Sequence, residues 1–336
     1  MSDLLSIGRS ALLTSAYALD VVGSNVANAD NPDYVRRVLN LADTTIHAGT
    51  NPIYNSSRGT GSVTSNGITR SSDQFLEAAT RQTGANRVSA EVLVQWLNQG
   101  EIALTNNDAD LGAQLTKLFG TAEELSAVPF EPALRNQFVG DIEATVDRFN
   151  QTALNLSSTV SLINGAASQE TAELNTALNE LTQINQKLLP AQIGSPQYAV
   201  LLDQRDAALT VITEKLDAQI SFGTNGIADV SRNGTNLVAY NVASPVTFVA
   251  GAGASFDIEI GAVVQAAPSN GTLGGLQRAQ SSLISLNNDL DTLAVQFATE
   301  INGWQANGWT DAGVAGAAII SHAGTAASLS TTGLSA

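Results

Sequence analysis

The chain contains no cysteine and only two histidines among its 336 residues. Without cysteine there is no disulfide framework, no thiolate metal site and no cysteine nucleophile. His47 and His322 fall in unrelated loop-like stretches, and no His-Glu-x-x-His spacing is present. The sequence therefore predicts no metal site and no bound cofactor.

Charge is also scarce, and positive charge most of all. Charged residues make up 14%, and 31 acidic residues against 15 basic ones give a formal net charge of −16. Such a balance argues against nucleic acid or an anionic membrane surface as the main partner. No apolar run approaches the ~18 residues of a membrane-spanning helix, so no membrane insertion is expected. The length allows about two domains with a well-buried core.

The beginning of the chain carries the most informative pattern. Apolar side chains follow one side of a predicted helix of about 25 residues. These are Leu5, Leu12, Ala16, Leu19, Val22 and Val26. Four of them recur every seven residues, which is typical of a seam that lies along another helix. The helix should stop near Asn28 and Pro32, where turn-forming residues accumulate. We find no mate for this seam within the chain and expect other subunits to bury it.

An extended stretch and a long helix are predicted next. Tyr34 to Leu41 has an extended pattern, and residues 44–70 are rich in turn-forming residues. Within them, Asn66-Gly67 predicts a short hairpin turn. Ser71 or Ser72 is expected to cap a long helix. Its apolar side is predicted to carry Leu76, Ala79, Ala90, Leu93, Leu97 and Leu104, flanked by Trp96.

Further helices follow after a break at 106–110. One spans 111–125, and the next has apolar residues at steps of three or four from Leu134 to Ile163 and should end at Asn164-Gly165. Separate helices are predicted over 174–188 and 198–216, and a last long one carries a stripe from Leu276 to Ile301. Together these stripes predict a core of several long helices.

Residues 218–270 change character. Short apolar runs are separated by Gly, Asn-Gly and Pro, which predicts a small antiparallel β subdomain. The runs are 219–222, 228–231, 237–241, 246–250 and 256–260. The expected fold is mainly α, a long-helix bundle with an antiparallel β insertion and an N-terminal coiled-coil-type helix. The expected domains are 1–43, 44–217 with 271–303, 218–270, and a tail of small residues over 304–336.

No stretch predicts a catalytic site. Asp203, Arg205 and Asp206 are charged, but a helix places the two aspartates on one face and Arg205 elsewhere, which favours structural pairing or capping of a neighbouring helix. Asp108 and Asp110 resemble half a calcium loop without its Gly and Glu. The glycine-rich stretch 251–253 lacks the last Gly of a dinucleotide fingerprint and the strand–helix context.

Residues 18–37, ALDVVGSNVANADNPDYVRR, resemble the N-terminal signature of flagellar axial proteins, the rod, hook and hook-associated families. That resemblance implies that Asn25, Asn28, Tyr34 and Arg36 belong to a family-specific turn. Asp33 stands where those families usually have Gly. An Asp tolerates a left-handed backbone better than most residues do.

Three later stretches are similar to the hook-associated protein 1 family. They are 115–139, the Leu-Leu-Asp-Gln-Arg-Asp motif within 198–212, and 271–309. Their order holds over roughly residues 3 to 310. The resemblance implies a structural component of the flagellum, not an enzyme, that joins hook to filament. Its terminal helices would build an inner tube.

The resemblance also implies partners and a location. The partners would be further copies in the assembled flagellum, the hook protein and a second hook-associated protein on the filament side. Asp3 and the absence of Lys or Arg before residue 9 fit export to the cell exterior without a cleaved signal peptide. The family closes with a second heptad helix near which its export chaperone binds. The ending SLSTTGLSA lacks that pattern, and with it the region where the resemblance would place the export chaperone.

Two alternatives remain open. A different flagellar axial protein, such as a hook–filament adaptor or a distal rod protein, would share the N-terminal signature. A secreted adhesin or glycan-binding module on a flagellar scaffold would expose aromatic residues on the β subdomain. The aromatic candidates there are Phe222, Tyr240, Phe248 and Phe256.

Overall fold

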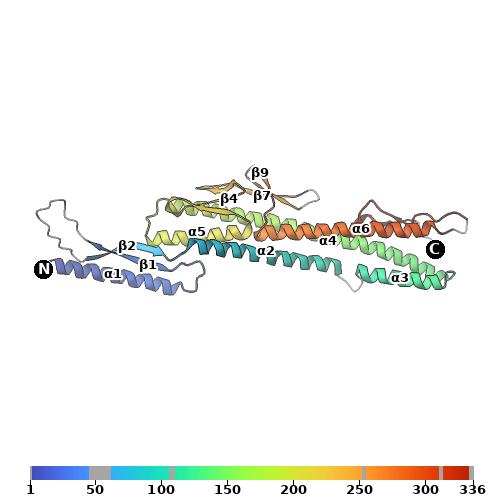
Figure 1. Cartoon of the computed structure of the whole chain (residues 1–336), viewed down its shortest axis with the longest axis horizontal. Helices are drawn as coiled ribbons and strands as arrows, with labels where there is room; N and C mark the ends of the chain where they lie inside the picture. The colour runs from blue at the N-terminus through green and yellow to red at the C-terminus, as the bar shows by residue number, and fades with distance from the viewer. Residues whose placement is uncertain (1, 45–61, 106–109, 252–254, 310–312, 333–336) are drawn as a thin grey trace. The chain divides into compact units, whose positions relative to one another are not determined.

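A computed structural model describes residues 2–44, 62–105, 110–251, 255–309 and 313–332 (Figure 1). Within these ranges the chain forms six α-helices, and short strands lie mostly between the fifth and sixth. The helices are α1 (Ser2–Ala27), α2 (Gln74–Thr105), α3 (Leu111–Ala127), α4 (Pro132–Leu188), α5 (Pro196–Lys215) and α6 (Gly271–Ala306). The prediction of a mainly α fold with inserted β-strands is confirmed.

The strands form four small sheets. β1 (Arg37–Thr44) pairs antiparallel with β2 (Ser62–Arg70), and this pair is called the ribbon below. A four-stranded antiparallel sheet has the order β3-β4-β5-β6, a three-stranded sheet has the order β7-β8-β9, and β10 pairs with β11. Their bounds are β3 Gln219–Phe222, β4 Ala228–Arg232, β5 Thr235–Ala239, β6 Val242–Ala243, β7 Val246–Val249, β8 Asp257–Ile260, β9 Val263–Ala266, β10 Ile320–Ser321 and β11 Ser330–Thr331.

Contacts divide the chain into two compact units. Unit 1 comprises Met1–Asn86, Ala172–Val246 and Ile260–Val263, and unit 2 comprises Arg87–Thr171, Thr247–Glu259 and Val264–Ala336. The long helices α2 and α4 therefore each contribute to both units. No change in local composition marks the boundary between the units. These two units are not the four domains expected from the sequence, and that domain division stays a prediction.

The core of unit 2 lies between helices. The predicted stripe of α4 is buried there, with Ile142, Phe149, Leu156 and Ile163 all at 0% exposure. Phe149 packs against Phe297 of α6, with ring centroids 5.5 Å apart. Each such side chain contributes roughly 1.5–3 kcal/mol by leaving water. The prediction of a multi-helix core is thus confirmed.

The C-terminal stretch also packs onto unit 2. Ile320, Ala326 and Leu329 are buried, and side chains of α4 and α6 bind their backbone. Asn150 donates to the Leu329 carbonyl at 3.1 Å, and Asp291 accepts from the Ala326 N–H at 2.7 Å. A tail of small residues is therefore held through its main chain, which small side chains leave accessible.

One hydrogen-bond arrangement recurs in both units, and we call it an amide clamp. A helix Asn donates its Nδ2 to the carbonyl of one residue in an extended segment and accepts that residue's N–H at its Oδ1. The side-chain amide thus satisfies both main-chain groups, as a neighbouring strand would. Amide clamps join Asn25 to Arg37, Asn175 to Val246, Asn185 to Ala228 and Asn302 to Ile320, at 2.7–3.1 Å.

Two predicted breaks are wrong. Asn164-Gly165 does not end a helix, because α4 runs through it; the Asn164 Oδ1 accepts from Gln280 of α6 at 2.6 Å, and Ile163 and Ala167 are fully buried. This burial outweighs the ~1 kcal/mol that a helical Gly costs. Asn66-Gly67 is not a hairpin turn but an irregularity inside β2, where Gly67 has φ +91°. The residues that join β1 to β2, with His47, lie outside the described ranges.

The predicted cap and apolar side of α2 are also wrong. Asp73, not Ser71 or Ser72, accepts from the first free N–H groups, at 2.8 Å from Phe75 N. Leu76 is 67% exposed, whereas the buried positions are Arg81, Ala85, Ser89, Gly100 and Ala103. Ser89 and Gly100 are buried because α6 comes close to them. A Cβ added to Gly275 would meet the Ser89 carbonyl oxygen at 2.6 Å.

Candidate assembly interface and its attachment

Helix α1 turns its leucines to solvent. Leu5 is 76% exposed, Leu12 73%, Leu19 71%, Val22 55% and Val26 72%, and Ala16 is exposed as well. These six residues, called the α1 stripe, are those that the heptad pattern selects. Within the described residues nothing covers them, although a face of this size and composition is normally buried.

The opposite side of α1 mixes apolar, small and polar side chains and lies on the ribbon (Figure 1). Val21, at 6% exposure, is the only buried side chain among those described in this helix. Around it stand half-buried positions at helical spacing: Ile7, Ser10, Thr14, Tyr17, Ala18, Ser24 and Asn25. The helix therefore turns its heptad leucines outward, while a mixed face centred on Val21 packs on its own chain.

The turn that follows α1, predicted to contain Asn25, Asn28, Tyr34 and Arg36, is organised by Asn25. Its amide clamp holds Arg37 at the start of β1, with both distances 2.9 Å. The Tyr34 hydroxyl donates to the same Asn25 Oδ1 at 2.9 Å and lies 3.2 Å from the Ser24 hydroxyl. Asn28 donates to the Ser24 carbonyl within the last turn of the helix. Asn25 and Tyr34 thus fix where the chain leaves α1.

Arg36 does not take part in this turn through its side chain. It is exposed, and the contact that involves it is its carbonyl, which accepts from Ser71 N at 2.8 Å. The neighbouring Arg37 points inward instead, with its guanidinium 4.7 Å from the centre of the Tyr34 ring. Sequence reasoning named Arg36 and missed Arg37, although alternation along a strand places one of two adjacent residues on the inner face.

A buried cluster of charges ties the ribbon to α5. Asp203 accepts from Arg37 Nη2 at 3.0 Å and from Arg70 Nε at 2.7 Å. Asp206 accepts from Arg70 Nη2 at 2.7 Å. We call Arg37, Arg70, Asp203, Arg205 and Asp206 the charge cluster. Their side chains are between 5% and 14% exposed. Both strands of the ribbon are thereby bound to one face of one helix.

The expected structural pairing of the aspartates takes an unexpected form. They pair with two strands and do not cap a helix. Arg205 was expected to point elsewhere, but its Nε donates to Asp206 Oδ1 at 2.9 Å. Its Nη1 donates to the Gly226 carbonyl at 2.6 Å, and it stacks on Phe222 at 4.5 Å. A long arginine side chain can bend back to a neighbouring position, which helical spacing alone does not reveal.

Two further charged groups of α2 border the charge cluster. Burial raises the pKa of the Glu77 carboxyl, and Asp206 adds to the rise, against the opposing effects of Arg70, Arg81 and Arg205. Burial likewise lowers the pKa of the Arg81 guanidinium, while Asp206 and Glu77 oppose that shift. Desolvation therefore exceeds pairing at both positions, so neither group is fully compensated where it stands.

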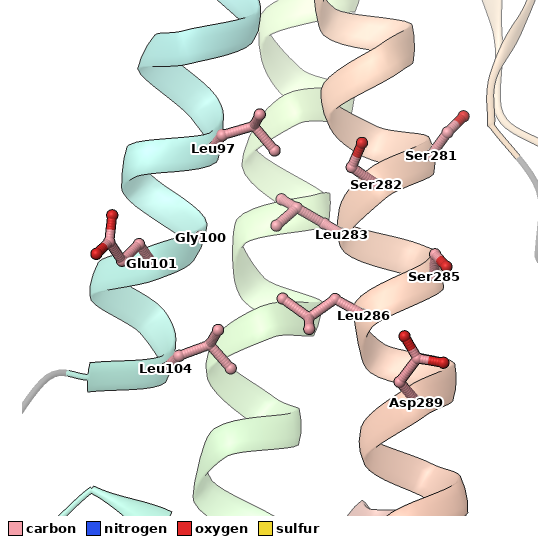
Figure 2. A pocket seen from close by; sticks show the side chains of 10 residues that line it. All are labelled: Leu97, Gly100, Glu101, Leu104, Ser281, Ser282, Leu283, Ser285, Leu286 and Asp289. Atoms are coloured by element: carbon pink, nitrogen blue, oxygen red, sulfur yellow. The ribbon is translucent and has the colours of Figure 1, made fainter.

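Unit 2 carries an apolar groove between α2 and α6 (Figure 2). Its volume is about 620 Å³, and two leucines from each helix lie on its walls. The leucines are Leu97, Leu104, Leu283 and Leu286. Glu101 and Asp289 stand beside them, and the lining contains no Lys, Arg or His. This groove is a seam between packed helices.

The described ranges hold neither a cluster of metal ligands nor a membrane-spanning helix. No group of three or more His, Asp or Glu side chains is placed there to hold a metal ion. Asp110, from the half calcium loop, caps α3 by accepting from Ala113 N at 2.7 Å, and residues 106–109 lie outside the described ranges. No described helix has the length and apolarity needed to cross a membrane.

The aromatic residues that an adhesin would expose are mostly covered. Phe256 is fully buried and stacks on Phe248 at 5.3 Å, while Phe222 lies under Arg205. Tyr240 alone of the four is exposed, at 40%. These positions give the adhesin alternative no support.

Comparison with known proteins gives a consistent result. Residues 97–319 match the family model described as the flagellar hook-associated protein FlgK helical domain. Curated proteins named flagellar hook-associated protein 1 are 24% identical: that of Salmonella typhimurium covers 92% of this chain, and those of Escherichia coli and Bacillus subtilis cover 93% each. The chain spans 57%, 59% and 68% of their lengths, respectively.

A solved structure shares the fold. The flagellar hook junction protein FlgK from Burkholderia pseudomallei aligns with a TM-score of 0.60 and 19% identity, over 72% of this chain and 46% of that chain. At this identity the likeness concerns the fold alone. It agrees with the succession of long helices with inserted strands described above.

Proposed function

Because this chain belongs to the flagellar hook-associated protein FlgK helical domain family, we propose that it is a structural subunit of the bacterial flagellum. It joins hook to filament, lies outside the cell, and is exported without a cleaved signal peptide. It acts by packing against other subunits and not as an enzyme. The curated relatives that it resembles carry the name of a hook-associated protein, and this supports the proposal.

The observation that carries the proposal is the α1 stripe. A helix that exposes leucines at heptad spacing, while its opposite side is occupied by its own chain, has its leucine side available for helices of other subunits. Those subunits are further copies of this chain, the hook protein on one side and a second hook-associated protein on the other. Burying one Leu contributes roughly 1.5–3 kcal/mol, so a stripe repeated around a ring gives a stable assembly.

The experiment compares two adjacent leucines of α1. Leu12 belongs to the stripe, whereas Leu13 is 60% exposed outside it. A strain from which the gene has been deleted is complemented with a gene that encodes either Leu12→Ser or Leu13→Ser. Leu12→Ser should reduce filament attachment in electron micrographs and swimming in soft agar, because a polar side chain enters the seam. Leu13→Ser should preserve both.

Both variants should unfold at the wild-type temperature as monomers, since the side chains they change are already in water. Normal swimming with Leu12→Ser, at normal protein levels, would contradict the proposed interface. Equal loss with both variants would show that exposed leucines in general, and not the heptad seam, carry the assembly.

A further inference from the structure

Arg37 is held by two helices at once. Its backbone N–H and carbonyl are bound by the amide clamp of Asn25, which belongs to α1. Its side chain is bound by Asp203, which belongs to α5, and rests on Tyr34. A continuous path of bonded groups therefore runs from the end of α1, through one residue, to the helical part of unit 1. Within the described residues no other side chain joins α1 and α5 in this way.

The rest of α1 has weaker attachments. One polar contact beyond the turn runs from the Thr14 hydroxyl to the Val63 carbonyl at 3.4 Å, which is long for a hydrogen bond. Among the described side chains of α1, Val21 alone is buried. Strand β2, in contrast, has its own connections to the body, through Arg70 and through Ile68 N, which donates to the Gly194 carbonyl at 2.7 Å. Strand β2 thus has anchors of its own in unit 1, whereas the bonds of Arg37 connect the end of α1 directly to α5.

We propose that Arg37 is the positioning residue of the assembly face: it sets the direction of α1, and so of the α1 stripe, relative to α5. This inference rests on the proposed function for its biological meaning. The geometric statement concerns unit 1 of the monomer alone and is tested there. Because the clamp fixes both main-chain groups of Arg37 and the ion pair fixes its tip, the residue transmits orientation and does not merely fill space.

The direction of α1 can be measured as a distance. The chain has no cysteine, so Ser15→Cys on α1 and Gln204→Cys on α5, both exposed, give a unique pair for spin labels. Pulsed electron–electron double resonance of the dilute monomer then reports the distribution of distances between the two spin labels. The parent pair should give one narrow peak. Arg37→Met, which keeps an apolar stem without the charge, should widen the distribution by about twofold or more as additional orientations are populated.

Two matched variants separate positioning from general damage. Arg36→Met removes the same group from the adjacent, exposed residue and should leave the peak narrow. Arg37→Lys restores a positive charge within reach of Asp203 and should return the width most of the way to that of the parent. A narrow peak with Arg37→Met, or equal widening with Arg36→Met, would overturn the proposal.

A second route avoids disturbing the buried charges. Asn25→Ala removes the bonds to the backbone of Arg37. As a single variant it should already widen the distance distribution. If both residues belong to one path, the Asn25→Ala, Arg37→Met pair should be little wider than either single variant, whereas independent effects would add. Full additivity would count against a single path. This route also serves if Arg37→Met fails to fold.

The outcome is separable from that of the proposed function. Distances in the monomer involve no assembly, and filament attachment with Leu12→Ser involves no change in Arg37. A widened distribution together with normal attachment by Leu12→Ser would leave the positioning role intact and remove the assembly role. The reverse pattern would retain the interface and assign its orientation to other contacts.

Discussion

Helix α1 and the first half of α4 carry the same kind of pattern and meet opposite environments. In α4 most apolar residues at steps of three and four are buried, with Ile142 and Leu156 at 0% exposure. In α1 the residues at heptad spacing are more than half exposed, as at Leu12 and Leu19. Periodicity therefore identifies which side of a helix is apolar, whereas the covering partner depends on what the rest of the chain supplies.

The two helices also differ in what holds them. The unit 2 half of α4 is held by side-chain packing, with polar bonds at its edges. Helix α1 is held by an amide clamp and, beyond it, by the charge cluster, both of which are directional and few. Apolar packing tolerates small shifts, whereas an amide that binds two main-chain groups fixes an angle. Apolar packing is therefore suited to a rigid helical core, and directional hydrogen bonds are suited to a helix such as α1 whose orientation must be fixed.

The largest expected effect comes from truncating a leucine in each helix. Leu156→Ala should lower the free energy of unfolding by about 2–5 kcal/mol, because it removes buried atoms and leaves a cavity. Leu12→Ala should change it by less than about 0.5 kcal/mol, because the side chain is already in water. Urea denaturation followed by circular dichroism measures both. A large loss of monomer stability with Leu12→Ala would break the comparison.

Two amide clamps give an intermediate effect and sharpen the comparison. Asn185 of α4 binds Ala228, and both residues are fully buried, so Asn185→Ala leaves a buried N–H and carbonyl without partners. We expect a loss of about 1–3 kcal/mol. Asn25→Ala exposes the equivalent groups of the half-buried Arg37 to water and should cost less. The control is Asn28→Ala, which removes a bond within a single helix end. Equal losses for Asn25 and Asn185 would mean that the surroundings of a clamp are immaterial.

The smallest effect concerns pH and the surroundings of the charge cluster that holds the end of α1. Burial raises the pKa of Glu77 above its usual value, against Arg70, Arg81 and Arg205 and with Asp206. A carboxyl with a raised pKa in the folded state contributes stability below its unfolded pKa, and this contribution is lost as pH rises through the folded value. Glu77→Gln should therefore flatten the stability profile just above the usual Glu range. Urea midpoints at a series of pH values test this.

The control for that prediction is a carboxyl outside the charge cluster. Glu91, exposed on α2 and paired with Arg87, has no comparable burial. Glu91→Gln should leave the profile unchanged in the same window. A profile that Glu77→Gln does not alter, or alters in the opposite sense, would mean that the surrounding arginines outweigh desolvation at this site.

Much of the fold follows from the sequence, because long stripes depend on local spacing. The stripes of α1 and α4, and strands β3 and β4, were predicted close to where they lie. The errors at Asn164-Gly165 and Asn66-Gly67 have one cause, since local turn preference was overruled by contacts with Gln280 and Gly194, which are remote in sequence. Such contacts have no local signal.

The site was predicted in part for the same reason. The α1 stripe and the importance of Asn25 and Tyr34 followed from pattern and resemblance, although the assembly role of these residues stays a prediction. The choice of Arg36 over Arg37 could not be corrected without knowing the phase of β1. Asp203 was recognised as structural, but its partners lie more than 130 residues away along the chain.

The outward leucines of α1 have a consequence for the unassembled protein. Under the proposed function, copies associate through the α1 stripe, whereas a net charge of −16 makes them repel one another at longer range. Dissolved salt shortens the reach of the repulsion and leaves the attraction in place. Self-association is therefore expected to increase with ionic strength. Low salt should keep the molecules monomeric, and high salt should favour their association.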